Sequence, residues 1–238
     1  MKILGIDSSG LVASVAIVED NELIGEYTLN YKKTHSQTLL PMLDELKQML
    51  ELDLSTIDAI AVAAGPGSFT GLRIGSATAK GLGLALDKPL IAVPTVDGMA
   101  YNLWGVKTNI CPIMDARRNQ TYTGLYCFDE NQKFQTLVEQ CAVDISEIIE
   151  KINTTGEAVT FLGDGVPVFQ SVIEESVTVP YYFAPAGLNR QRASALALLA
   201  MEYFKEGKTV SAADFRPDYL RLSQAERERL AAGGSIGE

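Results

Sequence analysis

Residues that commonly carry chemistry are scarce in this chain. Its 238 residues include a single histidine, His35, together with three cysteines and one tryptophan. One histidine and widely spaced cysteines cannot supply a zinc site made of histidine and cysteine ligands. A Ser-His-Asp site would have to use His35 itself. We therefore interpret His35 as a histidine that caps or packs near the start of a helix.

The chain also has fewer basic than acidic residues. Twenty Lys and Arg residues stand against 30 Asp and Glu residues, which gives a net charge of -10. Autonomous nucleic-acid binding rests on neutralising phosphates, so this balance argues against it. A partner could still hold the nucleic acid in a complex.

The chain lacks a signal peptide, a long apolar span and a regular cysteine pattern. Cys111, Cys127 and Cys141 are odd in number and fit no ligand spacing. Residues 1–2 lead directly into an apolar strand, so we expect no targeting segment before the fold. These features predict a cytoplasmic protein that does not bind membranes.

Hydrophobic patterning predicts a series of strands and helices that occurs twice. In the first half, strands are expected at residues 2–6, 12–18, 23–29, 59–64 and 90–93, and helices at 39–50, 71–86 and 95–101. The same order recurs between residues 110 and 173, although the sequence itself does not repeat. This order predicts an α/β fold of two lobes, built from duplicated βββαβα units, with a cleft between them.

We expect an N-terminal lobe at residues 1–105 and a C-terminal lobe at residues 106–238. A final helix is predicted at residues 193–204, and it is free to pack back on the first lobe. The charged, then glycine-rich, end of the chain is expected to be loose.

A glycine-rich loop, Gly65-Pro66-Gly67, precedes the helix at residues 71–86. Such a turn at a helix start can cradle a phosphate, because free backbone N–H groups point outward there. The loop lacks the lysine and Ser/Thr arrangement of a P-loop, and it is no dinucleotide fingerprint. The turn Asp7-Ser8-Ser9-Gly10 is likewise compatible with a phosphate loop or with an ordinary hairpin turn.

The helix that follows the loop is apolar nearly all round, so we expect it to be buried on more than one side. One stripe of this helix carries small residues four apart: Gly71, Gly75, Ala79 and Gly83. Such a stripe could let the backbone of another helix come close. Packing within the lobe, against the helix at residues 39–50, explains the same stripe, and the two interpretations are compatible. The predicted partner-binding residues are Leu39, Leu43, Leu46, Gly71, Ile74, Gly75, Thr78, Ala79, Leu82 and Gly83.

Several stretches resemble one known family. They are residues 3–9 (ILGIDSS), 34–41 (THSQTLLP), 65–75 (GPGSFTGLRIG), 94–96 (PTV), 114–122 (MDARRNQTY), 163–165 (GDG) and 217–221 (PDYLR). Together they are similar to the TsaB (YeaZ) family of tRNA threonylcarbamoyladenosine biosynthesis proteins, within the actin–Hsp70–sugar kinase (ASKHA) superfamily. The resemblance spans nearly the whole chain, and residues 65–75 and 114–122 are its most specific parts.

This resemblance implies a scaffold subunit and no catalytic group. The family is a bacterial, cytoplasmic, non-catalytic paralogue of TsaD, the subunit that transfers threonylcarbamoyl to N6 of adenosine 37 of certain tRNAs. Its first-lobe helices form a bundle with TsaD, and its homodimers use similar surfaces. We expect the chain to dock TsaD, to help recruit the ATPase TsaE, and to meet tRNA only through the complex.

The resemblance also implies that the ancestral ligand sites are degraded. TsaD holds a metal through two histidines four residues apart, whereas His35 is followed at that spacing by Leu39, so we predict no metal. Asp164 replaces part of a phosphate loop and opposes phosphates by charge. We interpret Asp7, Ser8, Ser9, Gly65 and Gly67 as a vestigial nucleotide site, and we predict no cofactor apart from ATP or ADP held weakly or at an interface.

The alternative is an ASKHA-type nucleotide-dependent kinase or hydrolase that uses Asp7 and the Gly65–Gly67 loop with the second lobe. The scaffold interpretation makes its own prediction: Gly75→Leu or Ala79→Leu abolishes partner binding and leaves each lobe folded.

Overall fold

The computed structural model describes residues 1–31 and 33–220, and it contains two five-stranded sheets with one topology. The strands are β1 (Lys2–Asp7), β2 (Ala13–Glu19), β3 (Glu22–Leu29), β4 (Ala59–Gly65), β5 (Leu90–Pro94), β6 (Asn109–Asp115), β7 (Gln120–Phe128), β8 (Phe134–Asp144), β9 (Val159–Leu162) and β10 (Tyr181–Phe183). The first sheet runs β3-β2-β1-β4-β5 and the second β8-β7-β6-β9-β10. In each, the first three strands are antiparallel and the last two add in parallel. The predicted fold class is confirmed.

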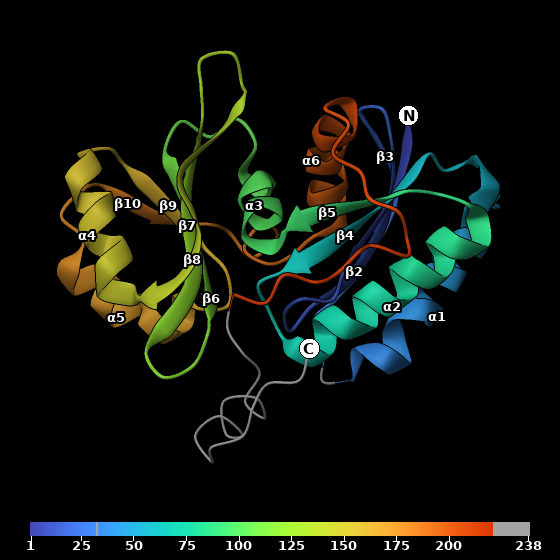
Figure 1. The fold of residues 1–238 in the computed structure, drawn as a ribbon. Coiled ribbons are helices and arrows are strands. Elements are labelled where there is room, and N and C mark those ends of the chain that lie inside the picture. Colours follow the sequence, from blue (N-terminus) through green and yellow to red (C-terminus); the bar gives the residue numbers. More distant parts are fainter. Residues whose placement is uncertain (32, 221–238) are drawn as a thin grey trace.

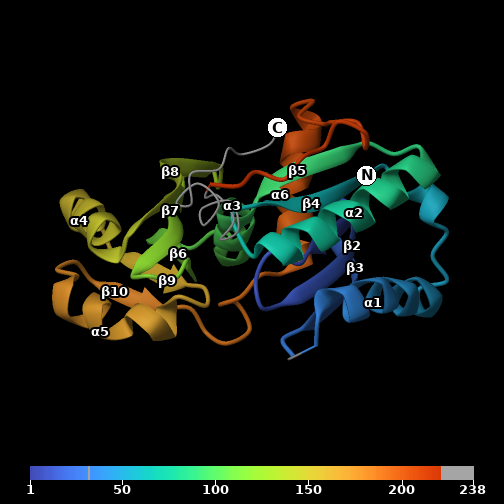
Figure 2. The same cartoon turned by 60° about the horizontal axis from the view of Figure 1, so that its bottom comes forward.

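Helices cover both faces of each sheet (Figures 1 and 2). They are α1 (His35–Met49), α2 (Phe69–Leu86), α3 (Thr95–Ala100), α4 (Ile145–Thr155), α5 (Val166–Ser176) and α6 (Ala193–Lys205), with short 3-10 turns η1 (Leu54–Thr56) and η2 (Tyr101–Leu103). In the first sheet, α1 and α2 pack on one face and α6 packs on the other. In the second sheet, α4 and α5 pack on one face, and α3 packs on the other. No helix in the described ranges is both long enough and apolar enough to span a membrane.

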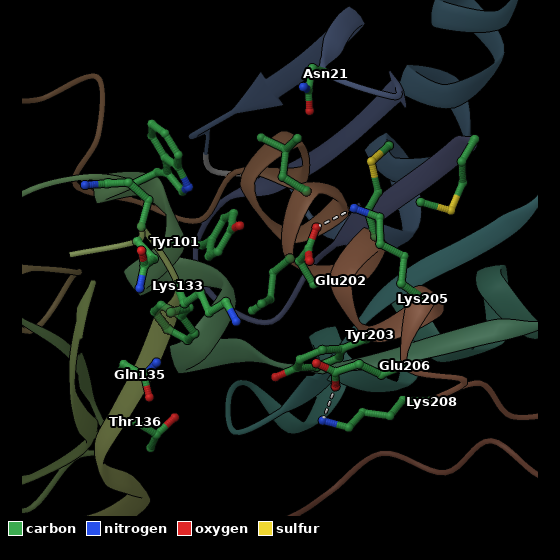
Figure 3. A pocket seen from close by; sticks show the side chains of 18 of the residues that line it. Asn21, Tyr101, Lys133, Gln135, Thr136, Glu202, Tyr203, Lys205, Glu206 and Lys208 are labelled. Carbon is green, nitrogen blue, oxygen red and sulfur yellow. Dashed lines mark hydrogen bonds and ion pairs between the residues drawn. The ribbon is translucent and has the colours of Figure 1, made fainter. Parts of the chain in front are cut away.

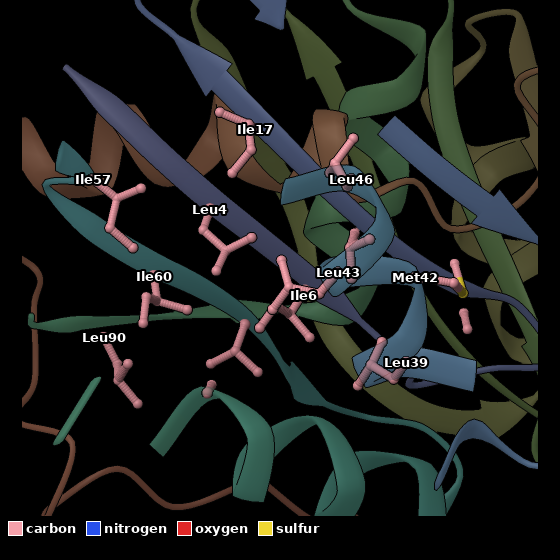
Figure 4. Close-up of a cluster of buried hydrophobic side chains, with 14 of the residues drawn as sticks. Leu4, Ile6, Ile17, Leu39, Met42, Leu43, Leu46, Ile57, Ile60 and Leu90 are labelled. Carbon is pink, nitrogen blue, oxygen red and sulfur yellow. The ribbon is translucent and has the colours of Figure 1, made fainter. Parts of the chain in front are cut away.

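The apolar face of α1 lies in the core of the first sheet (Figure 4). Leu39, Leu43 and Leu46 are at most 4% exposed and belong to the same buried cluster as Leu4 and Ile6. Their spacing on one helical face explains this burial. These three leucines are covered by their own lobe, which favours a role in the core; partner binding by them stays a prediction.

Helix α6 follows the second lobe in sequence but packs on the first sheet. A buried carboxylate, Glu26 of β3, holds its start. One oxygen accepts bonds from Nε and Nη2 of Arg192, and the other accepts bonds from the backbone N–H and hydroxyl of Ser194. Gly5 of β1 lies against the carbonyl oxygen of Ala193, and a Cβ there would overlap that oxygen. The helix is therefore fixed at a defined place on the sheet.

Replacing Glu26 by glutamine is expected to destabilise the chain by about 2 kcal/mol, because charge-assisted bonds to Arg192 are lost at a site where Glu26 is only 6% exposed. Urea unfolding measures the change. The matched control is Glu202→Gln, whose ion pair with Lys205 is solvent-exposed and should contribute less than about 0.5 kcal/mol. Equal effects of the two changes would contradict this account of the anchor.

After α6 the chain returns across the first lobe as a strap, residues 206–220. Leu90 and Val210 exchange backbone hydrogen bonds, and Lys80 Nζ donates to the carbonyl oxygens of Ala213 and Phe215. Phe215 is 2% exposed and joins the core beside α2. The prediction that the end of the chain is loose concerns residues 221–238, which lie outside the described ranges.

Candidate functional site

Asp7, Ser8, Ser9, Gly65 and Gly67 do meet at one corner of the first lobe, but they are packed against each other. The turn after β1 carries Asp7, Ser8 and Ser9, and all three are buried. Ser68 N–H donates to the carbonyl oxygen of Ser9 over 2.6 Å. Gly67 lies so close to that oxygen that a Cβ would overlap it. The protein's own backbone therefore occupies part of the space that a phosphate cradle would need.

Gly65 has a separate structural role. Its φ of 122° lies in a region that side chains disfavour. Its Cα faces the carbonyl oxygen of Asp218 in the strap, and Asp218 N–H donates to the Ala64 carbonyl over 2.7 Å. A glycine is thus required at position 65 by the turn and the strap, without any ligand.

Asp7 is a buried carboxyl group with few partners. It is 3% exposed, and its Oδ1 accepts bonds from the backbone N–H (2.9 Å) and hydroxyl (2.6 Å) of Ser9. Burial raises the pKa of Asp7 from 3.8 to about 6, against the opposing effects of the Ser9 bonds and the nearby His35. At neutral pH the buried carboxyl group is therefore mostly ionised, and burying that charge lowers the free energy of unfolding.

Replacing Asp7 by asparagine is expected to stabilise the chain at pH 8 by about 3 kcal/mol and to change little at pH 4. The folded pKa lies above the unfolded one, so the native state binds the extra proton, and wild-type stability falls as pH rises from about 4 through about 6. Urea unfolding of both proteins across this range measures the difference. A pH-independent difference would show that burial of the charge is not its cause.

A cleft of about 600 Å³ opens beside this corner, between the starts of α1 and α2 and the turn after β6. His35 lies in its wall, and its Nε2 is 2.8 Å from the carbonyl oxygen of Gly10. This contact agrees with a packing role. The charged lining groups are Lys33, Arg117, Asp115 and Asp164.

The charges of this cleft do not favour a phosphate. Burial raises the pKa of Asp164, with Arg190 opposing the shift. Arg117 is within 3.3 Å of Asp115, so part of its charge is already compensated. Within residues 1–31 and 33–220, no group of three or more His, Cys, Asp or Glu side chains is placed to hold a metal ion.

The stripe of small residues on α2 faces the lobe's own interior. A Cβ at Gly71 would overlap the carbonyl oxygen of Ser8, and one at Gly75 would lie 2.6 Å from Ser8 Oγ. Ala79 is fully buried, and a Cβ at Gly83 would lie 2.9 Å from Ala212. The first sheet, its turn and the strap already cover these four positions, which favours packing within the lobe; a partner-facing stripe there stays a prediction. Gly75→Leu and Ala79→Leu would disrupt the lobe itself.

A second stripe of small residues lies on the opposite side of α2. Ala77, Gly81 and Ala85 are again four residues apart, and all three are exposed. A Cβ at Gly81 would meet nothing within 4 Å. Leu84 beside them is 66% exposed. We call Ala77, Gly81, Leu84 and Ala85 the outer face of α2.

Three of the predicted partner-binding residues border this outer face. Ile74, Thr78 and Leu82 are half-buried, and the apolar pair among them also packs on the core. The outer face was not predicted, although Ala77, Gly81 and Ala85 show the same small-residue spacing in the sequence. Choosing between two small-residue stripes on one helix requires knowing which side meets the sheet.

Comparison with known proteins reveals full-length relatives. The family model of TsaD, tRNA N6-adenosine threonylcarbamoyltransferase, matches residues 22–229. The tRNA threonylcarbamoyladenosine biosynthesis protein TsaB of Bacillus subtilis is 35% identical over 95% of this chain and 96% of its own. The chain belongs to the TsaB family. TsaB of Escherichia coli is 32% identical over 94% of this chain and 96% of its own.

A solved structure supports the same relationship. YeaZ from Pseudomonas aeruginosa superimposes with a TM-score of 0.79 at 26% identity, covering 92% of this chain and 99% of that one. The resemblance to the TsaB (YeaZ) family is therefore confirmed, and the domain is related to that of TsaD.

Proposed function

We propose that the chain is the non-catalytic scaffold subunit of a cytoplasmic complex that forms N6-threonylcarbamoyladenosine at position 37 of tRNA. In this proposal it docks a TsaD-type catalytic paralogue, forms homodimers in isolation and helps recruit a TsaE-type ATPase. tRNA meets it only through the complex. Its membership of a family named for this biosynthesis supports the proposal.

The outer face of α2 is the observation that carries the docking role. Small side chains at Ala77, Gly81 and Ala85 leave the helix backbone open to close approach. The side chain of Leu84 adds exposed apolar surface to this face. Helix α1 lies alongside α2 (Figure 2). An apolar helix of a partner can lie along such a face with its backbone near that of α2.

The corner at Asp7 supports a role without catalysis. Its carboxyl group is buried and already bonded to Ser9, and the glycine loop packs on the same turn. Leu39, which stands where the resemblance places a second metal ligand in TsaD, is 1% exposed within the core. These contacts favour packing over ligand binding at the positions that an ASKHA enzyme would use.

Two experiments test this proposal. Co-elution of the chain with its TsaD paralogue should be lost in Gly81→Leu. Calorimetry with ATP and Mg²⁺ on the isolated chain should show no tight binding. Tight binding by the isolated chain would favour the alternative, a nucleotide-dependent kinase or hydrolase.

A further inference from the structure

A groove of about 1130 Å³ lies on the α6 side of the first sheet, away from α1 and α2 (Figure 3). One wall is the second half of α6 with the strap's first residues, including Glu202, Tyr203 and Lys208. The other wall is the turn between β7 and β8 and the start of β8. Tyr101 of η2 and Trp104, which directly follows η2, line one end. The proposed docking of TsaD on α2 leaves this groove open.

The edge of β8 faces the groove. Six consecutive residues, 131–136, line it. Residues 131–133 belong to the turn and 134–136 to β8. Side chains alternate between the two faces of a strand, so a single face of β8 could not supply three neighbouring residues. Since β8 is the last strand of its sheet and pairs with β7 on its other side, the edge that borders the groove pairs with no strand among residues 1–31 and 33–220.

The ladder shows which backbone groups point outward. The N–H of Asp129 donates to the carbonyl oxygen of Lys133 over 3.0 Å, so these two residues face each other as a bonded pair. Bonded and non-bonded pairs alternate along an antiparallel ladder. Phe134 lies opposite Phe128, and Thr136 lies opposite Tyr126, so both are non-bonded pairs. The backbone N–H and C=O groups of Phe134 and Thr136 therefore point away from β7, toward the groove.

An aromatic corner lies next to these groups. Trp104, the only tryptophan of the chain, is 58% exposed. Its ring meets Phe128 edge-on, and Phe134 packs on Tyr101 with ring centroids 5.5 Å apart. An apolar side chain that enters from the groove would cover this exposed ring.

The groove differs from the rest of the molecule in charge. Its lining carries the N-terminal amine and Lys133, Lys205 and Lys208 against the carboxylates of Asp20, Glu202 and Glu206. All three carboxylates are already in ion pairs, with the amine, Lys205 and Lys208. Lys133 forms no ion pair within the described ranges, although its charge also acts on the nearby carboxylate of Asp129. A slightly positive groove in a chain of net charge -10 favours an acidic ligand.

We propose that this groove binds an extended, acidic segment of a partner protein, which adds to the edge of β8 and places an apolar side chain against Trp104. Free N–H and C=O groups on a strand edge select an extended backbone. A second copy of β8 would bring its whole sheet into a groove whose opposite wall is α6, whereas a single extended segment brings only its own backbone. The volume exceeds that of most small-ligand pockets, which suits a peptide.

The test uses the emission of the single tryptophan in the full-length chain. The acetylated and amidated peptide EVEFEVE should shift Trp104 emission with a saturable curve, and its basic counterpart KVKFKVK should bind at least about tenfold more weakly. Thr136→Pro removes an outward backbone N–H and should lower the affinity for EVEFEVE about tenfold. Thr136→Val keeps that N–H and should leave the affinity unchanged. Lys133→Glu should reverse the preference between the peptides.

Other outcomes would overturn the proposal. Equal binding of both peptides, absence of saturable binding, or full affinity in a folded Thr136→Pro variant would each contradict strand addition by an acidic segment. An emission shift on deleting residues 221–238 would assign the groove to the chain's own end. An emission that changes with protein concentration would assign it to a second copy.

Discussion

Gly81→Leu is expected to abolish co-elution with the TsaD paralogue and to leave the chain folded. A leucine at this position projects outward, since no described residue outside its own stretch of α2 comes within 4 Å of a Cβ there. Leucine also favours the helix over glycine by roughly 0.8 kcal/mol, so the fold should not suffer. Its side chain would hold a partner helix away from Ala77 and Ala85, and we expect affinity to fall at least about a hundredfold.

The matched control for this experiment is Gly187→Leu. Gly187 is exposed and lies in the second lobe, far along the chain from α2. Apart from its chain neighbours, no residue that the structure describes comes within 4 Å of a Cβ there. This variant should co-elute with TsaD as the wild type does. Circular dichroism melting should give both variants a midpoint no lower than that of the wild type. Undiminished co-elution of a folded Gly81→Leu variant would remove the outer face of α2 from the docking surface.

Gly71→Ala is expected to destabilise the chain by about 4 kcal/mol or more, although it adds one methyl group. That methyl would overlap the carbonyl oxygen of Ser8, and Ser8 Oγ also donates to the carbonyl oxygen of Gly71 over 2.8 Å. The helix and the turn after β1 must separate to admit it, which breaks packing in the buried core.

Gly81→Ala on the same helix supplies the comparison. The substitution is chemically identical, but the new methyl meets open space, so the gain in helix propensity should stabilise the chain by about 1 kcal/mol. Urea unfolding of the two variants measures both changes. Similar changes of the same sign would contradict the assignment of Gly71 to the interior and Gly81 to the surface of α2.

Much of the fold could be predicted from local patterns. The amphipathic spacing of Leu39, Leu43 and Leu46 places one face of α1 in the core, and the short apolar run at β4 indicates a strand covered on both sides. The repeated order of strands and helices then indicates two sheets of the same topology. Each of these inferences depends on residues that are neighbours in sequence.

The candidate sites depend on contacts that no local pattern contains. Helix α2 is apolar on nearly every side, so periodicity could not say whether the stripe with Gly75 or the stripe with Gly81 is buried. Contacts of α2 with Ser8, from the turn after β1, and with Ala212, from the strap, decide between them. The groove beside β8 likewise joins the first residues of the chain to Lys133 and Lys208, so no contiguous motif marks it.

The most direct test of a scaffold that supplies no catalytic group is the yield of N6-threonylcarbamoyladenosine in tRNA. The reaction is reconstituted with TsaD, TsaE, tRNA and a threonylcarbamoyl donor, and the nucleoside is quantified by mass spectrometry. We expect no product without this chain, full yield with the wild type, and full yield with Asp7→Asn. Loss of product with a folded Asp7→Asn variant that still co-elutes with TsaD would show that the chain contributes to the chemistry.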